Sequence, residues 1–328
     1  MNEAIDCERL AGDIVAGDRA ALARAITLVE SSRPDHRGLA EDLLARLLPR
    51  TGGAIRLGLS GAPGVGKSTL IEHLGLRLIA RGHRLAVLAV DPSSPITGGS
   101  ILGDKTRMAE LARSPGAFIR PSPSGGQLGG VARHTAEAIL LTEAAGFDIV
   151  IVETVGIGQS EVAVAGLVDL FVLLLAPAAG DQLQGIKKGV IELADLLVVT
   201  KADGGLAGAA SEALAEYRAA LGLLGPAAAG RRAQALSCSA LTGTGLEELW
   251  QAIEHARAAR QESGAWQGRR AEQAGLLLAA EIGAALLSEF RADARIAAAY
   301  PEVQIQLSEG KLTPSEAARR LLALRAPK

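Results

Sequence analysis

Three segments of the chain differ in their pattern of hydrophobic and polar positions. Between residues 7 and 48, apolar residues recur mostly at steps of three and four, with breaks at 17–18 and 32–34, which predicts two or three amphipathic helices. Between 54 and about 257, short β-branched or Leu-rich runs alternate with helical stretches, as is typical of βα units around a parallel sheet. The expected strands are 54–60, 85–90, 117–121, 148–152, 167–175, 196–200 and 233–237.

Beyond a stretch containing Gly, Ser and Arg at 262–270, the chain is helical again, with an apolar stripe that includes Leu276, Ile282 and Leu286. Two capping boxes, at 244–247 and 313–316, predict helix starts, the second with proline at the first helical position. The stripe must be covered by packing within the chain or by a partner, and the pattern favours self-association. We therefore divide the chain into a helical extension (1–50), an α/β domain (51–260) and a helical arm (261–328).

Composition narrows the classes of function. The 328 residues allow about two domain equivalents, and the net charge of −2 lacks the basic surplus of a general nucleic-acid coat. Aromatic residues, at 2%, are too few for a base-stacking platform, and two cysteines cannot form a disulfide framework or a four-thiolate zinc site. The N-terminus is acidic where a signal peptide is basic, and no apolar run approaches the ~20 residues of a membrane span. We expect a cytoplasmic protein with no nucleic-acid or membrane partner.

A Gly-rich segment between the first expected strand and the next helix matches the phosphate-loop pattern GxxxxGK(S/T). In such a loop the backbone N–H groups and the helix N-terminus surround the β-phosphate. The ammonium of Lys67 then neutralises β- and γ-phosphate oxygens, and the Ser68 hydroxyl coordinates Mg²⁺. The predicted phosphate-binding residues are Gly61, Ala62, Pro63, Gly64, Val65, Gly66, Lys67, Ser68 and Thr69.

Three acidic residues are candidates for holding the metal and the attacking water. Asp91 ends the second expected strand, at the edge where ligands bind, although an ordinary turn aspartate before proline also fits. Asp104 lies in a Gly-rich, then charged segment typical of loops that order on the γ-phosphate, with helix capping as the alternative. Glu153 precedes Gly156 by three residues, the spacing of a DxxG switch with Glu for Asp, so the Gly156 amide can approach the γ-phosphate. The predicted metal ligands are Ser68, Asp91, Asp104 and Glu153, and the predicted catalytic residues are Lys67, Asp91, Asp104 and Glu153.

The sequence Thr-Lys-Ala-Asp at 200–203 favours guanine over adenine. A carboxylate at Asp203 can accept hydrogen bonds from guanine N1–H and N2–H₂, and the stem of Lys201 can lie along the base plane. Asn is usual where Thr200 stands, so the motif is weakened. Backbone N–H groups after the last expected strand can face the guanine carbonyl, and no thiol chemistry is needed there. These positions are Ser237, Cys238, Ser239 and Ala240.

Together these motifs resemble the G-protein chaperones of adenosylcobalamin-dependent acyl-CoA mutases, typified by the methylmalonyl-CoA mutase-associated GTPase and formerly labelled arginine/ornithine transport ATPases. The resemblance is carried by GAPGVGKST from 61, VLAVDPSSP from 87, TGGSILGDKTRM from 97, FIRPSPSGGQLGGVA from 118, FDIVIVETVGIGQSE from 147, AGDQLQGIKKG from 179 and TKAD from 200. It implies a P-loop NTPase fold of the signal-recognition and metal-insertase GTPase class, with a mostly parallel sheet, helical extensions at both ends and a homodimeric assembly.

The resemblance also implies an activity and a partner. The protein would hydrolyse GTP to GDP and phosphate with Mg²⁺, dock on the mutase, gate cofactor loading and reactivate the mutase, while adenosylcobalamin stays on the mutase. Family switch residues that relay nucleotide state fall on Asp181, Gln184 and Lys187, in a stretch that composition alone describes as a loop and helix start with solvated charges. Gln182, often acidic in relatives, and Thr200 depart from the family pattern.

The residues alone leave three alternative functions open. A nickel-type metal-insertion GTPase needs a His- or Cys-rich tract, whereas the five histidines here are scattered. A P-loop kinase or ATPase linked to amino-acid transport needs an acceptor pocket and no guanine motif. A scaffold that only binds nucleotide would fail a single-turnover hydrolysis assay.

Overall fold

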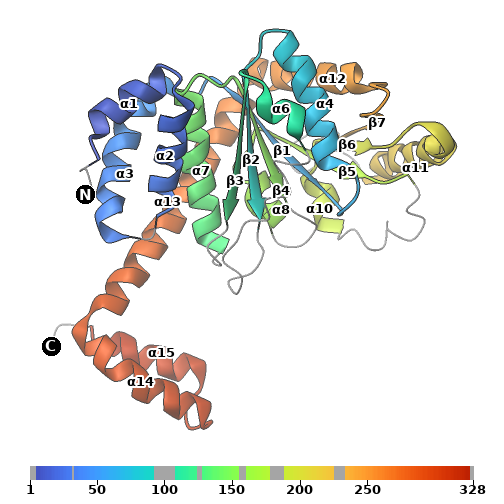
Figure 1. Ribbon diagram of the computed structural model, residues 1–328. Coiled ribbons are helices and arrows are strands. Elements are labelled where there is room, and N and C mark those ends of the chain that lie inside the picture. Colours follow the sequence, from blue (N-terminus) through green and yellow to red (C-terminus); the bar gives the residue numbers. More distant parts are fainter. Residues whose placement is uncertain are drawn as a thin grey trace. The chain divides into compact units, whose positions relative to one another are not determined.

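The described residues form a seven-stranded, all-parallel sheet with the order β3-β2-β4-β1-β5-β6-β7, which lies within the larger compact unit, Met1–Gln273 (Figure 1). The computed structural model describes residues 5–31, 33–91, 108–123, 128–154, 160–177, 188–224 and 233–325. The predicted fold class is confirmed, although the strand expected at 167–175 begins three residues later. The strands are β1 (Ile55–Gly61), β2 (Leu85–Asp91), β3 (Ala117–Pro123), β4 (Ile149–Thr154), β5 (Leu170–Leu175), β6 (Leu196–Val199) and β7 (Gln234–Ser237).

Helices cover both faces of this sheet, which explains why several strands are apolar almost throughout. On one face lie α4 (Lys67–Ala80), α6 (Ala109–Arg113) and α12 (Leu246–Glu262). On the other, α7 (Leu128–Ala144) and α8 (Ser160–Ala165) pack on the strands, and α10 (Lys188–Leu193) packs against α8. Helix α11 (Ala207–Leu224), which follows the short 3-10 turn η2 (Gly204–Leu206), contacts β6 and β7.

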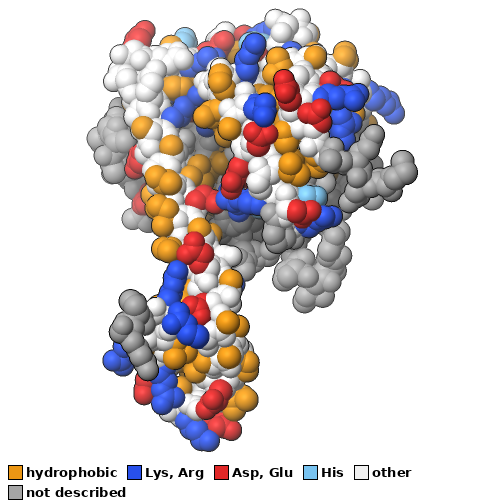
Figure 2. All heavy atoms as spheres, turned by 90° about the vertical axis from the view of Figure 1, so that its left-hand side faces the viewer, with side chains coloured by type: hydrophobic (Ala, Val, Ile, Leu, Met, Phe, Trp, Pro, Cys, Tyr) orange, Lys and Arg blue, Asp and Glu red, His pale blue; other side chains and the backbone are white. Residues whose placement is uncertain are grey.

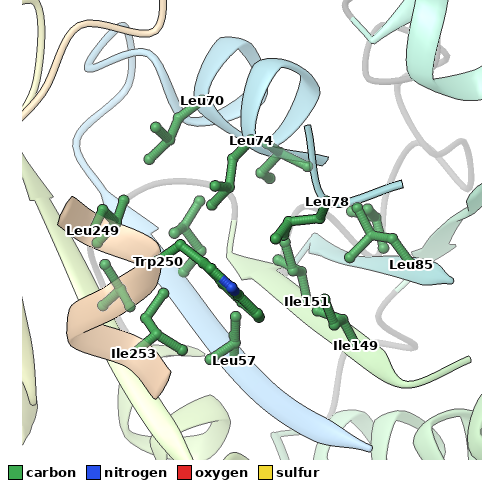
Figure 3. Packing of buried hydrophobic residues seen from close by; sticks show 14 of the residues in the cluster. Leu57, Leu70, Leu74, Leu78, Leu85, Ile149, Ile151, Leu249, Trp250 and Ile253 are labelled. Atoms are coloured by element: carbon green, nitrogen blue, oxygen red, sulfur yellow. The ribbon is translucent and has the colours of Figure 1, made fainter. Parts of the chain in front are cut away.

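The largest hydrophobic cluster lies between the sheet and the first of these helix layers (Figure 3). Trp250 of α12 lies beside Leu57 of β1, and Leu78 of α4 lies near Leu85 of β2 and Ile151 of β4. Burying each such side chain stabilises the fold by roughly 1.5–3 kcal/mol. The labelled members are Leu57, Leu70, Leu74, Leu78, Leu85, Ile149, Ile151, Leu249, Trp250 and Ile253.

The N-terminal extension folds as helices α1 (Cys7–Val15), α2 (Arg19–Val29) and α3 (Pro34–Leu47), followed by the 3-10 turn η1 (Leu48–Arg50). Asp6 and Asp18 cap α1 and α2, each accepting hydrogen bonds from two backbone N–H groups. All three helices contact α7, so they form an outer layer over that face (Figure 1). The helices expected between 7 and 48 are thus confirmed.

The chain separates into two compact units, Met1–Gln273 and Ala274–Lys328, with the boundary inside α13 (Ala265–Ala292). The second unit contains the rest of α13, α14 (Ala294–Ser308) and α15 (Pro314–Ala323). Figure 2 shows hydrophobic side chains at many points on the surface of this helical unit. The division at 50 and 260 stays a prediction.

The two predicted capping boxes have different outcomes. Thr313 caps α15, its hydroxyl accepting from Glu316 N, with Pro314 at the first helical position, as predicted. The box at 244–247 is wrong because Gly245, with φ +76°, precedes α12, and the Thr244 hydroxyl is hydrogen-bonded to that of Thr242. A Cβ at position 245 would lie 2.2 Å from the Ser237 carbonyl oxygen, so only glycine fits this turn.

Helix α13 is long and apolar enough to cross a membrane by length and composition, with 6% of its most apolar window buried. A single helix of this kind is weak evidence for a membrane. In α13 the apolar residues are interspersed with Gly and Glu, so the helix reaches this hydropathy without an uninterrupted apolar run of the length that a membrane span needs.

Candidate functional site

The loop between β1 and α4 has the backbone shape of a phosphate cradle. Gly64 and Gly66 have φ values of +78° and +102°, which L side chains rarely adopt. At Gly61 a Cβ would lie 2.7 Å from the Leu174 carbonyl oxygen, so the loop leaves the strand without room for a side chain. Lys67 begins α4, whose first N–H groups have no partner within the helix and suit an anion. The predicted residues 61–69 therefore run without a break from the end of β1 through the loop into the first turn of α4, a backbone shape that suits an anion.

The side chain of Lys67 bends back over this loop. Its Nζ donates to the Gly61 carbonyl at 2.7 Å and to the Ala62 carbonyl at 3.3 Å. The ammonium is thereby held within the same loop whose backbone N–H groups can bind phosphate oxygens. A cation at this place can offset charge on β- and γ-phosphate oxygens, the role predicted for Lys67.

The strand register brings the predicted carboxylate positions to the edge where the P-loop begins. Glu153 is paired with Leu59 of β1 on one side and with Ala89 of β2 on the other, and Asp91 is the last residue of β2. Glu153 is 3% exposed, and by strand alternation it faces the α4 side with Ile151. Carboxylate and hydroxyl oxygens are the donors Mg²⁺ prefers, so Glu153 and the half-buried Ser68 fit this ion. Within the described ranges, His, Cys, Asp and Glu form no group of three or more suited to a metal.

Several predicted site residues lie outside the described residues. They are Asp104, Gly156, Asp181, Gln184 and Lys187, and the side chain of Asp91 is not described either. The structure brings together the P-loop, Glu153 and the predicted base-binding segments.

A pocket of about 320 Å³ opens beside the P-loop at the predicted base-binding segments. It is lined from the P-loop and α4 by Gly66 and Thr69, and from the two base segments by Lys201, Asp203, Cys238 and Ala240. Leu206 and Leu241, 38% and 74% exposed, also border it and can contact a planar ring. Residues more than 130 positions apart in the chain thus share one pocket next to the phosphate cradle.

Two residues of the 200–203 segment hydrogen-bond directly to the P-loop backbone. The hydroxyl of Thr200, 4% exposed, donates to the Val65 carbonyl at 2.6 Å. Lys201 has φ +54°, and its Nζ donates to the Gly64 carbonyl at 2.7 Å. In the sequence, Thr200 was interpreted only as a weakening of the guanine motif, and this contact was not predicted. The signal available in the sequence was a hydroxyl at the end of an otherwise apolar buried strand, because a buried hydroxyl is nearly always hydrogen-bonded.

The two predicted base-binding segments are also joined to each other. The Ser239 hydroxyl donates to the Asp203 carboxylate and accepts from Thr242 N at 3.1 Å, and Ala202 N donates to the Cys238 carbonyl at 3.1 Å. A carboxylate has about four acceptor positions, so Asp203, oriented by Ser239, can still accept from a guanine edge.

Cys238 forms an apolar wall of the pocket. Its side chain is 1% exposed, and burial raises the pKa of its thiol to about 12. The thiol therefore stays protonated near neutral pH, which agrees with the expectation that no cysteine chemistry is involved.

Comparisons with known proteins give one consistent group of relatives. The family model described as "Methylmalonyl Co-A mutase-associated GTPase MeaB" matches residues 22–295. A protein of Caulobacter vibrioides named as a GTPase is 55% identical over 98% of this chain and 99% of its own length. The mouse protein "Methylmalonic aciduria type A homolog, mitochondrial" is 48% identical over 96% of this chain and 78% of its own. The crystal structure of an LAO/AO transport system kinase has a TM-score of 0.76 at 37% identity, covering 98% of this chain and 99% of that one.

Proposed function

Because the chain belongs to the methylmalonyl-CoA mutase-associated GTPase family and is a GTPase, we propose that it couples GTP hydrolysis to the service of an adenosylcobalamin-dependent acyl-CoA mutase. It docks on the mutase, most suitably methylmalonyl-CoA mutase, gates cofactor loading, and protects and reactivates the enzyme. Adenosylcobalamin binds the mutase and not this chain. The observation that carries the nucleotide part is the direct attachment of the base pocket to the P-loop through Thr200 and Lys201.

In this proposal the chain contributes charge and position to hydrolysis. P-loop N–H groups and Lys67 bind the phosphates and stabilise the charge that develops on the γ-phosphoryl oxygens. Asp203 selects guanine, and the carboxylates of Glu153, Asp91 and Asp104 position the metal and the attacking water. Ser68 and these three carboxylates would hold Mg²⁺, which would supply positive charge to offset that of the phosphate oxygens.

Nucleotide state would reach the mutase through Asp181, Gln184 and Lys187, with Gly156 sensing the γ-phosphate. The helical arm at 261–328 would hold two copies together as a homodimer. We place this assembly in the cytoplasm.

Co-purification tests the mutase part of the proposal. Tagged protein is mixed with purified methylmalonyl-CoA mutase, with GDP or with a non-hydrolysable GTP analogue, and bound mutase is quantified. We expect capture that depends on the nucleotide. Lys187→Ala should leave the GTPase rate of the free protein nearly unchanged while abolishing stimulation by the mutase. Equal loss of both activities would indicate a catalytic defect, and no capture under either condition would refute the docking proposal.

Lys67→Ala tests the nucleotide site itself. Because Lys67 stabilises transition-state charge, we expect kcat for GTP to fall by about 10³-fold. Wild-type turnover by this variant would show that the site is wrong. Competition of ATP against a fluorescent GTP analogue separates the GTPase from the kinase alternative, because a kinase of small molecules would prefer ATP.

A further inference from the structure

Three buried polar side chains outside the phosphate cradle form a hydrogen-bonded chain. The Thr154 hydroxyl at the end of β4 donates to the Ser60 hydroxyl of β1 at 2.8 Å. The Ser60 hydroxyl donates onward to Oε1 of Glu161 in α8 at 3.5 Å. Ser60 and Thr154 are 0% exposed and Glu161 is 1% exposed. Burying these polar groups costs free energy unless they are hydrogen-bonded. A hydrogen-bonded network in an otherwise apolar layer therefore points to a specific role.

The sequence around Gly58 explains why these side chains meet. Gly58 lies two residues before Ser60 on the same strand face, and a Cβ there would approach Phe171 to 2.8 Å, Val168 to 2.9 Å and Val164 of α8 to 3.2 Å. The missing side chain allows α8 to lie close on β1. Glu161, one turn before Val164, is thereby brought to Ser60.

Two residues of the network are adjacent in the chain to residues of the proposed nucleotide site. Ser60 directly precedes Gly61, whose carbonyl accepts from the Lys67 ammonium at 2.7 Å. Thr154 directly follows Glu153, the predicted metal and water-positioning carboxylate. Glu161 lies in the first turn of α8. Ser60 is thus a shared anchor for the strand that leads into the P-loop, the strand that carries Glu153 and the helix that follows.

We propose that Ser60, Thr154 and Glu161 are positioning residues for GTP hydrolysis, which fix Glu153 and the start of α8 relative to the P-loop. The proposal rests on the nucleotide site proposed above. None of the three touches the phosphates. They act by holding the groups that do, so their loss should lower the rate of the chemical step more than the affinity for GTP.

Steady-state GTPase kinetics of Thr154→Val and Thr154→Ser test this. Valine keeps the shape of threonine and removes the hydroxyl, whereas serine keeps the hydroxyl. We expect Thr154→Val to lower kcat about tenfold with KM for GTP within about twofold of wild type, and Thr154→Ser to retain most of the rate. Ser60→Ala should behave like Thr154→Val, and the double variant should be no slower than the slower single variant because both break one network.

Thr142→Val is the matched control. Thr142 of α7 is also 0% exposed, and its hydroxyl donates to the Ile139 carbonyl at 2.8 Å, so this variant loses a buried hydrogen bond away from the site. Its kcat should equal the wild-type value after correction for the folded fraction. A Thr154→Val rate matching Thr142→Val, or a Thr154→Ser rate as low as Thr154→Val, would overturn the proposal. Failure of the wild-type protein to bind a fluorescent GTP analogue would instead refute the nucleotide site, and the network with it.

Discussion

The two compact units differ in how they accommodate buried charged side chains and exposed apolar ones. In the first unit, buried carboxylates are paired with arginines that reach them from distant helices, as Asp169 is by Arg270 and Asp195 by Arg260. In the second unit, large apolar side chains remain on the surface, among them Leu276, 63% exposed. Further exposed members of this surface are Leu278, Ile282, Leu286, Leu287, Tyr300, Ile305 and Leu322.

This difference indicates that the first unit pairs its buried polar groups within itself, whereas the second unit leaves apolar surface to be covered. The arginines of the first unit satisfy backbone as well as carboxylate groups, since Arg270 also donates to the carbonyls of Gly52 and Ala54 at 2.7 Å each. The second unit contains a largely apolar groove of about 600 Å³ bordered by α13, α14 and α15. A helix stripe of exposed apolar residues beside an apolar groove is typical of a surface that packs against a partner. A covering partner, the second copy in the proposed homodimer, would complete the second unit.

The largest expected effect comes from breaking a buried ion pair of the first unit. Arg270→Leu leaves the carboxylate of Asp169, 1% exposed, without its charged partner, so the free energy of unfolding should fall by about 3 kcal/mol. Urea denaturation followed by tryptophan fluorescence measures this. Arg295→Leu is the control from the second unit. Arg295 is 58% exposed in its pair with Asp293, and because an exposed ion pair is screened by water, this change should cost much less than Arg270→Leu. Equal costs at both positions would contradict the contrast between the units.

The local features of the first unit could be predicted from the sequence, and its long-range contacts could not. Strand ends and the P-loop follow from apolar runs and glycine spacing, which are properties of neighbouring residues. Asp169 and Arg270 are 101 positions apart and carry no local signal, so their pairing appears only when the chain has folded. Thr200 shows the same limit at the site, because its partner Val65 lies 135 positions away.

In the second unit too, the helices could be predicted from local sequence, but what covers their apolar face could not. In the second unit, the capping box at 313–316 involves neighbouring residues and is correct, whereas the box at 244–247 in the first unit fails because Gly245 adopts a positive φ against the distant Ser237 carbonyl. An apolar stripe predicts that a helix face is covered but does not reveal by what. That question depends on an assembly and not on local pattern.

A smaller effect is expected from substitutions in the groove of the second unit. Leu286 and Leu322, 51% and 58% exposed, both border it. The double variant Leu286→Gln, Leu322→Gln should weaken dimerisation at least tenfold while changing the unfolding free energy of the monomer by only about 0.5 kcal/mol. Light scattering during size-exclusion chromatography over a dilution series measures the first quantity. Leu48→Gln, at 58% exposure in the first unit, is the control and should leave the oligomeric state unchanged. A double variant with wild-type self-association would show that the groove is not the dimer contact.

The smallest effect concerns helix caps that occur in both units. A hydrogen bond from the Arg295 side chain, together with one from Arg295 N, lowers the pKa of Asp293, the cap of α14, to about 2 from 3.8. A carboxylate whose pKa is lower in the folded than in the unfolded protein stabilises the fold at pH values above its unfolded-state pKa. This contribution is lost as the pH falls through the folded-state pKa of about 2. In Asp293→Asn at pH 5, amides of α14 should exchange hydrogen about threefold faster than in wild type, after correction for intrinsic rates. The ratio should approach one near pH 2.

Asp18→Asn places the same change in the first unit. Asp18 caps α2 by accepting from Ala20 N at 2.7 Å and Ala21 N at 3.1 Å, and these hydrogen bonds lower its pKa. However, α2 is packed against α7 with six buried residues, whereas α14 buries Ile296 alone among its described residues. Local opening of α2 must therefore break tertiary packing in addition to the cap. We expect exchange in α2 to change less than in α14, and equal acceleration of both helices would mean that packing does not distinguish the two units.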